Sequence, residues 1–219
     1  QLYVKRYPYS VYGLAFALTK VLVEDGDHIR IGSTYSKHLA QSMIETLETV
    51  CANHLNRAFN ASYLGGDGKA LIANDHPDIA GGAAGANSRS NLLTTSAALS
   101  QTSLEQMLIQ IRQAEDPRGK KIRVSPKKLV VAPGNMLTAE VLLKSVLRAG
   151  TNNNDLNPVK SMGLLSDVAV LSRLTSATAW FVQTDAPEGI KVLWRRKTEK
   201  AMEGDFETDS MRYKSTERY

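Results

Sequence analysis

Apolar side chains recur at spacings of three and four between about residue 28 and residue 60. This period predicts one long α-helix with a single apolar face, although Gly32 weakens its first turns. At 1.5 Å per residue the helix would be roughly 48 Å long, and it therefore needs a packing surface along its whole length. A charge in the middle of this face, as in Leu47→Asp, is expected to destabilise the subunit strongly. The candidate interface residues are Leu39, Met43, Leu47, Val50 and Leu55.

Two further helices are predicted in the middle of the chain. Thr102 and Glu105 have the spacing of a capping box and precede an apolar face, which predicts a helix from about 102 to 115. Residues 135–149 have a helical pattern, with Gly150 at the position favoured just past a helix end. The polar run that follows is expected to be a loop.

Extended structure is predicted at both ends of the chain and in between. Residues 1–24 are rich in Tyr, Val and Leu and favour two strands of an extended arm. Residues 204–219 alternate as one half-exposed strand would. Short apolar runs predict four more strands, at "KKLVVAP", "LLSDVAVLS", "TAWFVQT" and "IKVLWRR". The sum is an α+β chain with one very long helix.

The composition narrows the class of protein. A chain of 219 residues can bury a sizeable core, and no window approaches the apolar length of a membrane-spanning helix. The single cysteine, Cys51, excludes an internal disulfide and fits a reducing compartment. Because the chain starts at Gln1 and stops within a charged, strand-like run, we expect it to be a piece of a longer polypeptide.

The net charge of +5 is modest, but its distribution is uneven. Residues 118–128 hold six cations and no acid. Two interpretations stay open: the segment faces an anionic partner such as nucleic acid, or its cations are solvated or pair with acids of another subunit. The six cations are Arg118, Lys120, Lys121, Arg123, Lys127 and Lys128.

The glycine-rich stretch from 65 to 91 invites catalytic interpretations that its residues do not support. It lacks the first glycine and the hydroxyl residue of a phosphate-binding loop, and the first glycine of a dinucleotide fingerprint. Asp75 and His76 could belong to a hydrolytic triad, but the chain has no G-x-S-x-G motif, and Asp-His-Pro is more typical of a turn. The four histidines are scattered, so no metal or cofactor site is predicted.

The order of the predicted elements points to one family. An extended arm is followed by a long helix ending in "NRAFN", the loop "DGKALIANDHP…SN", a helix, "GKKIRVSPKKLVVAPG", a second helix, "NP" and "TAWFVQT". This succession resembles the major capsid proteins of tailed bacteriophages, particularly the group with Mu-like head subunits. Their fold is shared with encapsulins and with the floor of the herpesvirus capsid. The resemblance spans nearly the whole chain.

The resemblance implies a structural protein with no catalytic activity and no cofactor. Its α+β fold would be the tailed-phage capsid fold, in which the long helix is the spine of a peripheral domain. Carried onto this sequence, residues 1–27 are the extended loop, 28–62 plus 186–219 the peripheral domain, and 63–185 the axial domain, with the N-terminal arm missing. The subunits would self-assemble into pentamers and hexamers of an icosahedral shell around packaged double-stranded DNA.

The same resemblance implies the partners and the location. The chain would contact itself and packaged DNA, with portal, scaffold and decoration proteins as further partners and no membrane, in a virion assembled in the host cytoplasm. The basic segment would meet DNA phosphates without reading sequence. An arm of this length cannot bury its own aromatic side chains, so they would contact a neighbouring subunit. These side chains are Tyr3, Tyr7, Tyr9 and Tyr12.

Two alternatives stay open. The first is an encapsulin-like compartment with the same fold, which nucleic acid or enzyme cargo in the interior would distinguish. The second is a hydrolase that uses Asp75, His76 and a serine, or a basic nucleic-acid-binding module built on residues 118–128. A monomer that hydrolyses an ester, or that binds DNA with an affinity that depends steeply on salt, would favour this second alternative.

Overall fold

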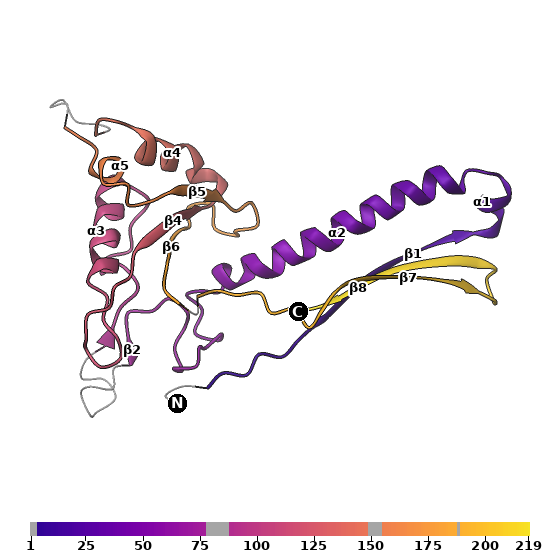
Figure 1. The fold of residues 1–219 in the computed structure, drawn as a ribbon, viewed down its shortest axis with the longest axis horizontal. Coiled ribbons are helices and arrows are strands. Elements are labelled where there is room, and N and C mark those ends of the chain that lie inside the picture. Colours follow the sequence, from indigo (N-terminus) through magenta and orange to yellow (C-terminus); the bar gives the residue numbers. More distant parts are fainter. Residues whose placement is uncertain (1–3, 78–87, 149–154, 188) are drawn as a thin grey trace. The chain divides into compact units, whose positions relative to one another are not determined.

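A computed structural model describes residues 4–77, 88–148, 155–187 and 189–219 (Figure 1). Helices and strands are both present, so the chain is α+β, as predicted. It divides into two compact units, each with its own sheet. The helix–sheet unit comprises residues 6–51 and 191–219, and the central unit comprises residues 1–5 and 52–190.

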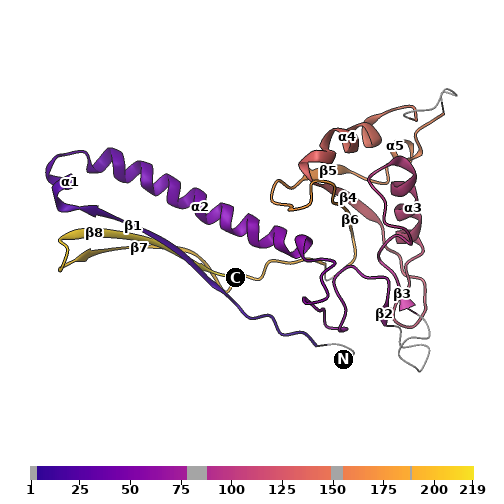
Figure 2. The same cartoon turned by 180° about the vertical axis from the view of Figure 1, so that it is seen from behind.

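The helix–sheet unit consists of a three-stranded antiparallel sheet and most of the long helix. The sheet has the order β1-β8-β7, so strands from the two ends of the sequence pair. The helix α2 runs along one face of this sheet in both views (Figures 1 and 2). It ends at Asn56, which confirms the predicted long helix with a slightly earlier end. The elements are β1 (Val11–Thr19), α2 (His28–Asn56), β7 (Arg196–Asp205) and β8 (Ser210–Arg218).

The glycine in the first turns of α2 has a packing role. A Cβ at Gly32 would lie only 3.2 Å from Leu18 Cδ1, so the missing side chain gives room to the buried leucine of β1. The helix propensity lost at Gly32 is therefore offset by closer packing against the sheet. On the same face of the sheet, Phe16 and Tyr213 are paired in register and stack with ring centroids 5.0 Å apart.

The N-terminal arm differs from the sequence prediction. The described part of residues 1–24 contains one strand, β1, followed by the short helix α1 (Lys20–Glu24), and the prediction of two strands is wrong. Thr19 ends the strand and caps the helix, because its Oγ1 accepts a hydrogen bond from Leu22 N at 3.4 Å. The strand that pairs with β1 is β8, which a local pattern cannot reveal.

The C-terminal segment also differs. Residues 204–219 contain the end of β7, a turn and β8, and "IKVLWRR" is not a strand before Arg196, so both predictions are wrong here. Asp209 reverses the chain with φ of 50°, in the left-handed region that few non-glycine residues adopt. A tight hairpin can preserve the alternation of side chains on both sides of its turn, which is why the pattern was consistent with a single strand.

The central unit packs helices against a second three-stranded sheet. β4 lies between β5, to which it is parallel, and β6, to which it is antiparallel. These three strands confirm three of the four short strands predicted. They are β4 (Pro126–Val131), β5 (Asp167–Val170) and β6 (Trp180–Thr184), and the helices are α3 (Gln101–Arg112), α4 (Met136–Lys144) and α5 (Pro158–Ser161), with a 3-10 turn at Pro133–Asn135. The core is formed by Leu99, Leu104, Leu108, Leu129, Val131, Ala139, Leu142, Val159 and Leu165.

Helix α3 is confirmed, but its cap is not the predicted one. Ser100 is the N-cap, and it forms a capping box with Ser103 in place of Thr102 with Glu105. Ser–Ser pairs are uncommon in this role, because the third position usually carries Glu or Gln. Glu105 instead receives two hydrogen bonds from the Arg148 guanidinium at 2.9 Å. The side chain that gave the predicted capping signal therefore ties α3 to the segment after α4.

Helix α4 ends earlier than predicted. It stops at Lys144, and Ser145 is extended, with φ of −61° and ψ of 134°. The Asn157 amide donates to Leu142 O at 2.8 Å and to Ser145 O at 3.1 Å, which satisfies carbonyls at the helix end. A buried asparagine thus replaces the predicted glycine cap, and Gly150 itself lies outside the described residues.

Candidate functional site

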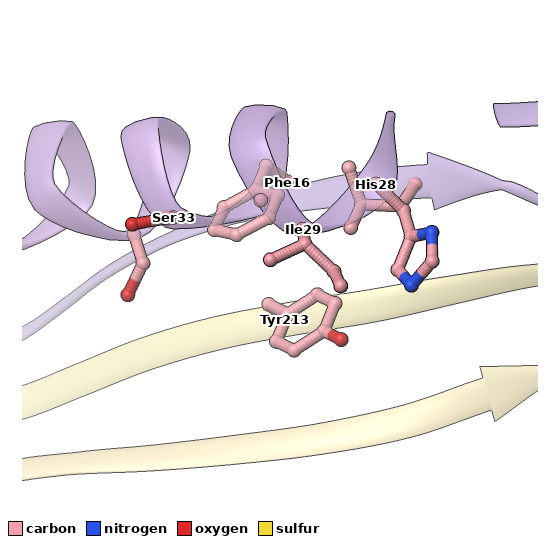
Figure 3. A pocket seen from close by; sticks show the side chains of 8 residues that line it. Phe16, His28, Ile29, Ser33 and Tyr213 are labelled. Carbon is pink, nitrogen blue, oxygen red and sulfur yellow. The ribbon is translucent and has the colours of Figure 1, made fainter. Parts of the chain in front are cut away.

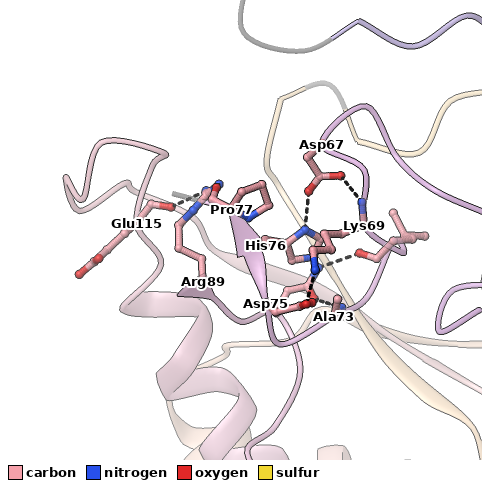
Figure 4. A network of polar contacts seen from close by, with 10 residues as sticks. Asp67, Lys69, Ala73, Asp75, His76, Pro77, Arg89 and Glu115 are labelled. Carbon is pink, nitrogen blue, oxygen red and sulfur yellow. Dashed lines mark hydrogen bonds and ion pairs between the residues drawn. The ribbon is translucent and has the colours of Figure 1, made fainter. Parts of the chain in front are cut away.

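The described part of the glycine-rich stretch is held by a polar network around His76 (Figure 4). His76 Nδ1 lies 2.6 Å from Asp67 Oδ2, and Asp67 Oδ1 accepts a hydrogen bond from Lys69 N at 3.2 Å. The Lys69 ammonium forms an ion pair with Asp75. The carboxylate that holds His76 is therefore Asp67 and not its sequence neighbour Asp75.

The expected turn at Asp75-His76-Pro77 is wrong. His76 and Pro77 form the short strand β2 (His76–Pro77), which pairs with β3 (Ser88–Arg89). Arg89 supports the pair, because its guanidinium donates to Pro77 O at 3.0 Å. The intervening residues 78–87, with three of the six glycines of the stretch from 65 to 91, lie outside the described residues.

The network has two of the three members of a hydrolytic triad, an Asp and a His, and no described nucleophile bonds the His. Within the described part of the chain His76 Nε2 is buried without a hydrogen-bond partner, so no serine hydroxyl contacts it. No group of three metal-ligating side chains occurs among the described residues either. Asn91 adds to the network by bonding Leu71 O at 2.8 Å and Ala73 N at 2.9 Å. These contacts join two distant segments of the loop, which is a structural role.

The charge state of Asp67 is coupled to this network. Partial burial works against ionisation, but the hydrogen bonds from the His76 side chain and the Lys69 backbone outweigh it, so the pKa of the Asp67 carboxyl lies below its usual range. A lowered pKa in the folded state means that the ionised carboxylate stabilises the fold above its ordinary pKa. This contribution is lost as the pH falls through the folded-state pKa.

We expect Asp67→Asn to destabilise the protein by about 1 kcal/mol near neutral pH, because a charge-assisted hydrogen bond is lost. The difference from wild type should shrink as the pH falls below the ordinary carboxyl pKa and vanish below the lowered folded-state pKa of Asp67, where the carboxyl is itself protonated. Urea unfolding of both proteins across this pH range measures it. A difference that does not change with pH would show that the carboxylate charge has no part in holding His76.

The basic segment runs from the connection after α3 into the first residues of β4 and is less cationic than its sequence suggests. All six cations predicted there, at positions 118, 120, 121, 123, 127 and 128, are exposed. Two acids just before the segment fold back on it: Lys121 Nζ lies 2.5 Å from Glu115, and Asp116 accepts backbone N–H bonds from Arg118 and Lys120. The Lys120 bond is the main cause of the lowered pKa of Asp116. The other five cations form no ion pair with described residues.

The predicted face of the long helix is buried unevenly. Leu39 and Met43 are buried, whereas Leu47, Val50 and Leu55 are half-buried. Within the helix–sheet unit, α2 is therefore most deeply buried at Leu39 and Met43. These residues lie before Leu47, where the sequence indicated the middle of the apolar face.

The aromatic side chains of the arm fall into two groups. Tyr7 and Tyr9 are exposed, whereas Tyr12 lies in β1 and stacks on Tyr219 with ring centroids 4.7 Å apart. Tyr12 therefore finds a partner in its own chain, against the expectation that no aromatic side chain of the arm could do so. Tyr3 lies outside the described residues, and contacts of Tyr7 and Tyr9 with a neighbour stay a prediction.

A groove of about 240 Å³ opens between the first turns of α2 and the sheet (Figure 3). Phe16, Ile29 and Tyr213 give it an apolar lining, and the His28 ring lies at one end. The groove combines residues from three elements, so no local sequence pattern reveals it. Its lining is mixed, because His28, Ser33 and Ser36 of α2 accompany the apolar side chains.

Large apolar side chains are also exposed on the central unit. Leu137 is 73% exposed, and its neighbours on and after α4 are similarly accessible. The exposed set around α4 and α5 comprises Met136, Leu137, Val141, Val146, Leu147, Leu156 and Met162. Such surfaces are typical of proteins that make contacts with other subunits. No described helix has the length and apolar character needed to span a membrane.

The exposed apolar surfaces are of the kind that proteins use for contacts with other subunits. The comparisons with known proteins agree, because the family model for phage capsid proteins matches residues 6–219, and the chain belongs to this family. It is thus a structural component of the virion capsid. Neither the search of curated proteins nor the search of solved structures gave a match to this chain.

Proposed function

We propose that this chain is the major capsid subunit of a tailed phage with Mu-like head proteins and that it self-assembles into pentamers and hexamers of an icosahedral shell around double-stranded DNA. The observation that carries the proposal is the family match over residues 6–219. In this proposal α2 is the spine helix, residues 28–62 and 186–219 form the peripheral domain, 63–185 the axial domain, and 1–27 the extended loop. Assembly takes place in the host cytoplasm, with portal, scaffold and decoration proteins as further partners.

The exposed apolar side chains support contacts between copies of the chain. Leu137, Leu156 and Met162 each leave more than half of their surface accessible. Burial of such side chains against a neighbour gives roughly 25 cal/mol per Å² of apolar area. When one surface of a subunit binds a different surface of the next copy, the same contact repeats along the series. The series closes into a ring when the rotation between copies allows it. Rings of five and six are the capsomers of an icosahedral shell.

The basic segment is proposed to face the packaged DNA. Arg118, Lys120 and Arg123 are exposed and form no ion pair with described residues, so they are available to phosphates. Replacing these three by Gln should leave shells intact and lower the amount of DNA that they package. A shell with an unchanged DNA content would overturn this assignment and favour acids of a neighbouring subunit as the partner.

Negative-stain electron microscopy of the purified full-length protein tests the proposed assembly. We expect closed shells, and cryo-electron density inside shells recovered from infected cells should be that of nucleic acid. Enzyme cargo in the interior would support an encapsulin-like compartment instead. Monomers under all assembly conditions would contradict both kinds of shell.

A further inference from the structure

A second groove, of about 210 Å³, lies between the middle of α2 and the same sheet. Its walls include Met43 and Leu47 from α2 and Trp194 from the segment before β7. The strand β8 supplies Ser215 and Glu217, which also line the groove. An apolar helix face thus lies across from a carboxyl group within one unit of the structure.

Glu217 is almost completely buried, with 2% of its surface exposed. One carboxylate oxygen, Oε2, accepts a hydrogen bond from Thr198 Oγ1 at 2.9 Å, whereas Oε1 is buried without a partner among the described residues. The hydroxyl of Ser215, which is 1% exposed, is likewise unpartnered within the described part of the chain. A buried carboxylate normally has its oxygens bonded, because removal from water is otherwise costly. Glu217 Oε1 and the Ser215 hydroxyl therefore line the groove without a hydrogen bond of normal geometry to a described residue. The phenol of Tyr219, buried and likewise without such a bond, interacts with the same carboxyl group.

The wall beside the carboxylate is aromatic. Trp194 meets Tyr219 edge-on, with ring centroids 5.1 Å apart. Burial raises the pKa of the Tyr219 phenol, and the negative charge of Glu217 adds to the effect, so this side chain stays neutral. An aromatic wall next to a carboxylate is a good environment for an organic cation, because both attract positive charge.

We propose that this groove binds a primary alkylammonium group. The ammonium has three N–H donors, which suit Glu217 Oε1 and the Ser215 hydroxyl, and Trp194 lies beside the charge. The alkyl chain runs along Met43 and Leu47, as long cationic side chains do on apolar surfaces. A lysine side chain of a neighbouring copy and a free diamine both carry this chemistry. The first source rests on the proposed assembly, and the second does not.

Titration of the full-length subunit with n-butylammonium chloride, followed by the tryptophan indole signals in ¹⁵N–¹H NMR spectra, tests the site. The chain has two tryptophans, and the Trp194 signal is assigned by its loss in Trp194→Phe. We expect a saturable shift of the Trp194 signal, with the Trp180 signal unchanged as an internal reference. Sodium chloride at equal ionic strength should give no such shift.

Two variants and one control identify the groups that bind. Glu217→Gln should weaken binding by about tenfold or more, because the charge-assisted hydrogen bond is lost. Ser215→Ala should weaken it by a smaller factor, and it keeps the test usable if the first variant does not fold. Glu203→Gln removes an exposed carboxylate from β7 and should leave binding unchanged.

Three results would overturn the proposal. The Trp194 signal does not shift, or Glu217→Gln binds as tightly as wild type. The third concerns Lys200, which also lines the groove: binding that appears only in Lys200→Met would mean that this lysine already occupies the site. We expect Lys200→Met to bind at least as tightly as wild type, because the variant removes a positive charge from the groove.

A comparison of free subunits with assembled shells separates the two sources of the ligand. Loss of n-butylammonium binding on assembly assigns the site to a lysine of a neighbouring copy, and retained binding assigns it to a free amine; each result supports the site. The titration of free subunits does not require assembly. A failure of the proposed shell function would therefore appear in the micrographs and not in this titration.

Discussion

Leu129→Ala should lower the free energy of unfolding by about 2 to 5 kcal/mol, the range for a leucine removed from a well-packed core. Leu129 is fully buried, on the central strand of its sheet, opposite Val168 on β5 and Val182 on β6. The strands β5 and β6 flank Leu129 and hold the side chains around it in place. The cavity left by the shorter side chain therefore cannot collapse completely. Urea unfolding followed by tryptophan fluorescence measures the loss, because Trp180 packs against this core.

Val170→Ala is the matched control for Leu129→Ala. Val170 lies on the neighbouring strand β5 and is 39% exposed, so its truncation should cost less than about 1 kcal/mol. Equal losses for the two variants would contradict the assignment of Leu129 to the centre of the core.

Met43→Asp is expected to cost more than about 3 kcal/mol and to prevent accumulation of soluble, folded subunits. Met43 is 5% exposed on the face of α2 that lies against the sheet, and a carboxylate there would lose most of its contact with water. Expression yield, helical circular dichroism and urea unfolding provide the measurements. Leu47→Asp should have a smaller effect than Met43→Asp, because Leu47 is only half-buried.

The control for the helix is Ile44→Asp at the adjacent position. Ile44 is 59% exposed, so this variant should fold with nearly wild-type stability. If Met43→Asp were as stable as Ile44→Asp, the buried face of α2 would have been assigned to the wrong residues.

The parts of the fold that the sequence predicted correctly have strong local signals. The apolar period of α2 recurs over many turns, so shifts of a few residues at its ends do not change the prediction. β4, β5 and β6 are short apolar runs bounded by turn residues, and each was confirmed. The resemblance to phage capsid proteins used the order of these elements, which is also local information, and the family match confirmed it at that level.

The candidate sites were harder to predict, because they depend on contacts between distant residues. The ion pair between Lys121 and Glu115 is not visible when cations are counted from residue 118 onward. The contact of His76 with Asp67 spans nine residues. One local signal could have found Asp67: it precedes Gly68, whose φ of 77° marks a turn, and its carboxylate bonds the backbone of Lys69.

By itself the sequence determined the long helix, the α+β class, the capsid family and the lack of a complete catalytic motif, since each depends on residue types in local order. Only the tertiary structure decided that β1 pairs with β8, that Asn157 caps α4 and that Glu217 lies buried in a groove beneath α2. The physical reason is that burial and hydrogen-bond partners are set by which distant segments meet. A charged residue such as Glu217 follows the same local pattern whether its strand faces water or the underside of a helix.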